Sequence, residues 1–183
     1  MNLNFNLYFM KTFLSALILL ISSVAVVAQD EKSFFVGGGA TYNMVKNLTI
    51  SNPVDQLGFY VVASQNGKLT DHFGYTGEGV ITNQRIKYAG VTTSVYSANG
   101  GFYFNYYPTK EKLRVLAGVQ FGMILDAKSA EHEIDGYGKG YFSFNYGLAY
   151  QLDKIEIIAK SNNMIGLSAF DGYFSIGAGY KIN

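Results

Sequence analysis

Four charged residues have types and spacing that could form a buried polar network: Glu78, Arg114, Glu156 and Lys160. Each falls on the smaller, more polar face of a segment whose other face is apolar. A charge that is removed from water must pair with an opposite charge or keep contact with water. We therefore predict that Arg114 and Lys160 bridge the two carboxylates, and we treat Asp126 and Lys181 as further candidates for the same face.

Catalytic chemistry has little support in the sequence. A hydrolase or acyltransferase needs a histidine that is positioned beside a serine or a carboxylate, yet neither His72 nor His132 has a partner at such a spacing. No nucleophile-elbow motif is present, and the sequence GLSAF at 166–170 does not complete one. We expect a protein that is not an enzyme and that carries no cofactor.

Two further motifs suggest ligands but are incomplete. Three successive glycines at 37–39 lie inside an alternating segment, whereas a phosphate-binding loop needs a strand before it and a helix after it. Acidic residues also gather in one polar stretch, but their spacing matches no complete calcium loop: Asp126, Glu131, Glu133 and Asp135. We read the glycines as bends or as room for a neighbouring aromatic ring, and we expect no metal site.

The elements that must position the four charges are β-strands. Apolar and polar residues alternate with a period of two, most clearly at 113–126, 141–152 and 173–182. The same alternation occurs at 34–43 and 154–162, and weaker versions occur at 57–65, 72–83 and 101–107. The sequence therefore predicts eight strands.

The length and the faces of these strands favour a membrane barrel. Several segments run for ten residues or more, which matches the roughly 9 to 11 tilted residues that cross a bilayer and exceeds the usual globular strand of about five or six. Phe, Leu, Ile and Val form one continuous face, and Gly, Ser, Asn and Gln form the other. A soluble sandwich or lipocalin is the alternative, but it would need a larger and more charged outer face.

The connections favour closure of these strands into an antiparallel barrel. Tight turns are predicted at Asn66-Gly67 through Asp71, at 108–112 and at Asp153-Lys154, and longer polar loops at 44–56, 84–100, 127–140 and 161–172. Short turns on the periplasmic side and long loops outside are typical of outer-membrane barrels. We predict an all-β fold, a closed antiparallel eight-stranded transmembrane β-barrel, whose narrow lumen is filled by side chains.

The N-terminal region has the order of a secretory signal peptide. Lys11 precedes an apolar run that continues to Ala28, and a charged stretch follows at once. A transmembrane anchor is the alternative, but the run is shorter than the roughly 20 residues of a spanning helix. We expect a signal peptide at 1–28 and a barrel domain at 29–183. The chain has no Cys, and its formal net charge of +1 gives no footprint for nucleic acid.

Four segments carry a resemblance to a known family: FFVGGGATYN, GGFYFNYYPTKEKLRVLAGVQFGMIL, YFSFNYGLAYQL and YFSIGAGYKIN. With these segments the chain resembles the small outer-membrane β-barrel proteins (porin-like, OmpA/OmpX-type) of Gram-negative bacteria, especially those of the Bacteroidota. The resemblance covers nearly all of residues 33–183. It implies a location in the cell outer membrane, contact with outer-membrane lipids and insertion by the outer-membrane assembly machinery, but no particular activity.

Three functions fit these observations. The first is a non-enzymatic barrel with a structural or surface-interaction role, in which the long loops bind an extracellular ligand or surface partner. The second is a narrow porin-like channel or a barrel that binds a small ligand, which requires an open lumen. The third is a lipid-modifying outer-membrane enzyme. A filled lumen favours the first.

Overall fold

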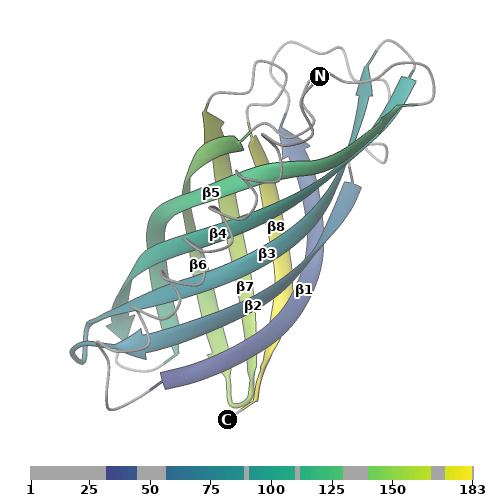
Figure 1. Ribbon diagram of the computed structural model, residues 1–183. Helices are drawn as coiled ribbons and strands as arrows, with labels where there is room; N and C mark the ends of the chain where they lie inside the picture. The colour runs from purple at the N-terminus through teal and green to yellow at the C-terminus, as the bar shows by residue number, and fades with distance from the viewer. Residues whose placement is uncertain are drawn as a thin grey trace.

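A computed structural model describes residues 32–44, 57–88, 91–109, 112–129, 140–165 and 172–182. Alternating apolar and polar residues form eight strands there: β1 (Lys32–Met44), β2 (Leu57–Lys68), β3 (Phe73–Tyr88), β4 (Val91–Thr109), β5 (Leu113–Ser129), β6 (Gly140–Leu152), β7 (Ile155–Ile165) and β8 (Gly172–Lys181). All neighbours are antiparallel, and β8 pairs with β1, so the sheet closes in sequence order (Figure 1). The predicted closed eight-stranded barrel is confirmed.

Small residues form the seam at which the barrel closes. Gly37 of β1 pairs with Gly179 of β8, and Gly39 pairs with Gly177. A side chain at Gly37 or Gly39 would collide with backbone atoms of β8. Gly37 and Gly39 therefore serve the close approach of β1 and β8, and the three glycines at 37–39 do not form a phosphate loop.

The two ends of the barrel differ. At one end, called the turn end here, short connections join β2 to β3, β4 to β5 and β6 to β7, and β1 begins and β8 ends there (Figure 1). The opposite end is called the far end. The predicted turn at Asp153-Lys154 is confirmed, with Asp153 in the left-handed backbone region at φ 53°.

Two of the predicted connections are wrong. The stretch 84–100 was expected to be a loop, but β3 continues to Tyr88 and β4 already begins at Val91. Asn66-Gly67 was expected to form a hairpin turn. Both residues instead belong to β2 and pair with residues of β3, and the turn lies at 69–72. Residues 127–129 and 161–165 also belong to strands rather than to loops. In each case a polar stretch proved to be strand, and several of its described polar side chains are buried, such as those of Gln84, Asn99 and Asn162.

The outward face of the barrel is apolar, as the inside-out pattern predicts. Along β6 the exposed side chains are aromatic or aliphatic, and the side chains between them are buried or half-buried on the lumen face. Phe121, Phe142 and Phe144 form edge-to-face contacts with ring centroids 4.9 Å apart. Within the described ranges, the chain has no helix with the length and hydropathy to cross a membrane.

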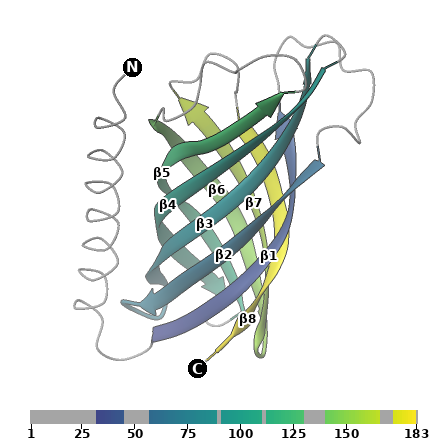
Figure 2. The same cartoon turned by 45° about the vertical axis from the view of Figure 1, so that its right-hand side comes forward.

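Three strands continue beyond the rest at the far end. Pairing of β3 with β2 stops at Asn83, and pairing of β5 with β6 stops at Met123, whereas both strands go on pairing with β4. The result is a three-stranded extension, made of residues 84–88, 91–97 and 124–129, which projects past the barrel in both ribbon views (Figure 2). Side chains of β1 reach it, since Asn43 Nδ2 donates a hydrogen bond of 2.6 Å to the carbonyl oxygen of Arg85.

Candidate functional site

The lumen near the turn end holds an ion pair between β5 and β7. Arg114 donates two hydrogen bonds to the Glu156 carboxylate, from Nε at 3.1 Å and from NH2 at 2.6 Å. Its remaining donor group, NH1, bonds to Asn66 Oδ1 at 3.0 Å and to Thr76 Oγ1 at 2.5 Å. The planar guanidinium therefore joins β2, β3, β5 and β7, which a lysine could not do with this geometry.

A second ion pair crosses the middle of the lumen. Lys160 Nζ lies 2.6 Å and 2.7 Å from the two carboxylate oxygens of Glu78. Tyr103 donates a hydrogen bond of 2.6 Å to the same carboxylate, and the Lys160 ammonium also lies 5.0 Å from the centre of the Tyr103 ring. The charge of Glu78 is thus shared by two donors on different strands, as burial demands.

The two pairs and an apolar layer between them fill the lumen. Strands β3 and β7 lie four positions apart in a ring of eight, so the link from Lys160 to Glu78 spans opposite walls. Leu116, Ala149 and Tyr103 form a buried apolar cluster, with Ile158 packed against it. The cavity among the four charged side chains measures only about 20 Å³, which is room for about one water molecule.

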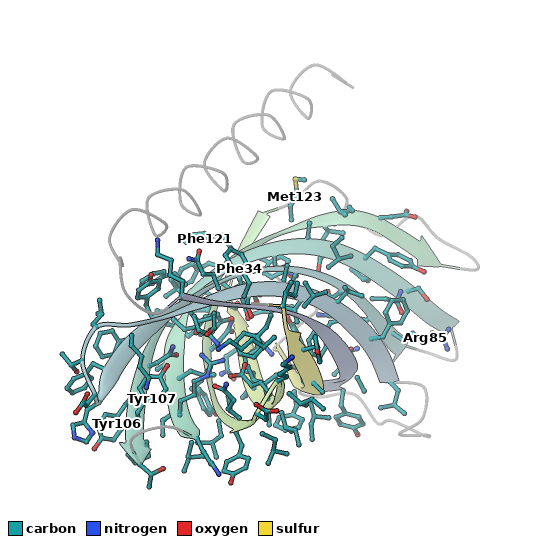
Figure 3. The ribbon with its side chains drawn as sticks, turned by 90° about the horizontal axis from the view of Figure 1, so that it is seen from below. Phe34, Arg85, Tyr106, Tyr107, Phe121 and Met123 are labelled. Carbon is teal, nitrogen blue, oxygen red and sulfur yellow. The ribbon has the colours of Figure 1, made fainter. Side chains whose placement is uncertain are left out.

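Polar side chains continue the filling toward the far end. Asn145 donates hydrogen bonds to Tyr103 Oη at 3.0 Å and to Gln120 Oε1 at 3.2 Å. Beyond them the Tyr141 hydroxyl bonds to Ser97 and to Asn99. Polar side chains therefore line the lumen from Arg114 to Tyr141 in several hydrogen-bonded groups, and the view from below shows side chains in the interior (Figure 3).

Three lumen glycines make room for lumen tyrosines. A side chain at Gly101 would collide with the Tyr103 ring, one at Gly122 with the Tyr141 ring, and one at Gly177 with the Tyr60 hydroxyl. The interpretation of strand glycines as space for a neighbouring aromatic ring is confirmed at these positions.

The structure brings the four predicted charges together as two pairs rather than one mixed cluster. Asp126 lies instead in the three-stranded extension, paired with Tyr96, and Lys181 lies at the turn end. Sequence reasoning missed Asn66, Thr76 and Tyr103 as partners. Asn66 was assigned to a turn, whereas the alternation at 101–107 already placed Tyr103 on the same face as Gly101 and Asn105.

Groups for other chemistry are sparse in the described part of the chain. His72 lies in the β2–β3 turn, where its Nδ1 is 3.0 Å from the carbonyl oxygen of Tyr107. Within the described part of the chain, no group of three His, Asp or Glu side chains is placed so that it could hold a metal ion. His132, the acidic residues at 131, 133 and 135 and the GLSAF stretch lie outside the described residues, and so does the predicted signal peptide at 1–28.

Comparison with known proteins identifies the fold. No protein-family model and no curated protein matches the sequence. Among solved structures, Ail of Yersinia pestis matches with a TM-score of 0.52 and 16% identity, over 84% of this chain and 100% of Ail. Neisserial surface protein A matches with a TM-score of 0.51 and 16% identity, over 84% of this chain and 100% of its own chain. The outer membrane protein OprG of Pseudomonas aeruginosa matches with a TM-score of 0.53 and 12% identity, over 85% of this chain and 98% of OprG. The chain therefore has the fold of the small eight-stranded outer-membrane β-barrels.

Proposed function

We propose that this protein is a non-enzymatic barrel of the bacterial outer membrane, where a filled, non-conducting barrel holds a surface-interaction region at its far end. The observation that carries the proposal is the link between Lys160 and Glu78, which joins opposite walls of the lumen. An eight-stranded barrel leaves little interior space, and the 20 Å³ cavity beside this link is too small for a solute.

Conductance tests the filled lumen. Purified native protein in a planar bilayer is expected to give no single-channel steps, because its lumen is filled by two ion pairs and an apolar layer. Arg114→Met provides a variant with one pair removed, and it too should stay silent, since the Lys160 link is intact. Steady conductance of the native protein would favour the narrow-channel function instead.

The far end supplies the interaction surface. The three-stranded extension carries Arg85 and Lys87 on β3 and Lys128 on β5, and the Arg85 side chain is exposed. Ail, which shares the fold, has been solved in complex with the heparin analogue sucrose octasulfate. Sulfated polysaccharide is therefore the first ligand class to test here, because basic residues favour polyanions.

Intact cells provide both the orientation and the binding test. The chain has no Cys, so a single Arg85→Cys variant reports one site; a membrane-impermeant maleimide should label it, whereas Leu69→Cys at the turn end should stay unlabelled. Cells that carry the native protein should bind heparin, and R85Q/K87Q/K128Q should reduce that binding. Labelling of Leu69→Cys but not of Arg85→Cys would show that the barrel has the opposite orientation. Unchanged heparin binding by R85Q/K87Q/K128Q would exclude the extension as the heparin site.

A further inference from the structure

A hollow of about 400 Å³ lies at the turn end, on the side of the barrel formed by β5 to β8. Three lysines line it, Lys112, Lys154 and Lys181, together with Asp153 and two apolar side chains that face outward, Tyr180 and Ile182. None of the four paired charges lines this hollow, although Gln151 and Lys181 also line a neighbouring hollow that Arg114 and Glu156 border.

The fold brings these lysines together from three separate segments. Lys112 precedes β5, Lys154 lies in the β6–β7 turn and Lys181 ends β8. Backbone hydrogen bonds tie these segments, from Gln151 N–H to the Lys112 carbonyl at 2.8 Å and from Lys181 N–H to the Lys154 carbonyl at 2.7 Å. The backbone segments that carry the three lysines are thus held together at one place on the rim.

The charge of the hollow suits an anion. Three cations face one carboxylate, that of Asp153. Among the residues that the structure describes, none of the three lysine side chains forms an ion pair. An ammonium group is a compact point charge with three donors, which suits the oxygens of a phosphate group.

The apolar flank of the hollow suits a lipid. Tyr180 is 54% exposed and Ile182 is 64% exposed, and both lie on the outward face. Tyr180 pairs with Ile155, which is itself exposed, so the apolar surface continues up β7 from the hollow. Aromatic residues at the edge of an apolar band mark the level of the lipid headgroups. An amphiphile could place its anionic head in the hollow and its acyl chains on β7 and β8.

We infer that this hollow binds the phosphate headgroup of an anionic phospholipid in the leaflet at the turn end. The inference rests on the proposed membrane location. Basic residues beside a membrane attract anionic lipids. Here three lysines line one hollow, and its apolar edge favours a ligand with an apolar tail over a ligand that is fully water-soluble. The selected chemistry is a phosphate diester with an apolar tail.

Native mass spectrometry tests the site on the intact barrel, released from vesicles that contain equal amounts of phosphatidylglycerol and phosphatidylcholine. The native protein should retain phosphatidylglycerol selectively. Each lysine-to-glutamine change should weaken that retention about fivefold, and K112Q/K154Q/K181Q roughly 100-fold. R85Q/K87Q/K128Q is the matched control, since it removes three cations at the far end, and it should retain phosphatidylglycerol like the native protein.

Several results would overturn the inference. They are equal retention of both lipids, an equal loss in the far-end control, and displacement of phosphatidylglycerol by inorganic phosphate, which would indicate a site for free anions. Lys154→Gln, a change in an exposed turn, replaces the triple variant if that variant does not fold. Insertion into the vesicles is measured first: a native chain that does not insert defeats the proposed function as well, whereas an inserted barrel without lipid selectivity defeats this inference alone.

Discussion

The two ion pairs of the lumen share a geometry but differ in their access to water. Both have a closest N–O distance of 2.6 Å, and all four side chains are at least nine-tenths buried. Arg114 and Glu156, however, also line a hollow of about 450 Å³ at the turn end. Glu78 and Lys160 line the 20 Å³ cavity inside the lumen and do not line that larger hollow. Burial of the intact pair is therefore a poor guide to its energetics, because what matters is whether water can reach the partner that a mutation leaves behind.

The largest effect is expected from Lys160→Met. This change leaves the Glu78 carboxylate in the middle of the lumen with the Tyr103 hydroxyl as its remaining donor. Loss of one partner of a buried pair costs about 3–5 kcal/mol. Urea unfolding in lipid vesicles, with heat-modifiable gel migration as the readout, measures the loss in the free energy of unfolding. The double variant K160M/E78L should recover most of the lost stability, because it also removes the unpaired carboxylate. A Lys160→Met variant as stable as the native protein would contradict the expected cost of burying an unpaired charge.

A smaller effect is expected from Arg114→Met. Glu156 loses its partner there too, but it borders the open hollow and can be hydrated from the turn end. The loss should then approach that of hydrogen bonds to a charged group, about 1.5–3 kcal/mol, in the same urea assay. If Arg114→Met costs as much as Lys160→Met, the difference in water access carries no energetic weight, and the comparison fails.

The smallest effect is expected from Tyr103→Phe. It removes one of the two donors to Glu78 but leaves the Lys160 ammonium in place, so the cost should be about 1.5 kcal/mol, the lower limit for a hydrogen bond to a charged group. Tyr60→Phe is the matched control, because the Tyr60 hydroxyl has no hydrogen-bond partner among the described residues, and its removal should be nearly neutral. Equal losses in the two variants would show that the Tyr103 hydroxyl does not share the charge of Glu78.

Most of the fold could be predicted from the sequence, because a period-two pattern fixes which face of each strand is apolar. The eight strands and their antiparallel closure follow from that pattern and from the turns. The ends of β3 and β4 could not be predicted, since residues 84–100 are polar in the manner of a loop. Several of these polar side chains, those of Gln84, Ser97 and Asn99, are instead buried.

The candidate site was only partly predictable. Alternation places Glu78, Arg114, Glu156 and Lys160 on the lumen face, but it does not say which cation meets which carboxylate. That choice depends on the stagger of the strand register, which is linked to the tilt of the strands relative to the barrel axis. Asn66 illustrates the remaining error: its sequence neighbour Gly67 suggested a turn, and only the pairing with Thr76 shows that its side chain reaches Arg114.

The link between Lys160 and Glu78 also has a kinetic consequence. Its two residues are 82 positions apart in the chain and lie on opposite walls, so they can meet only after the intervening strands have paired and the walls face each other. Contacts that form after the rate-limiting step slow unfolding and leave the folding rate almost unchanged. The link should therefore govern how long a folded barrel survives, whereas the speed of its insertion is set by the local hairpins that form first.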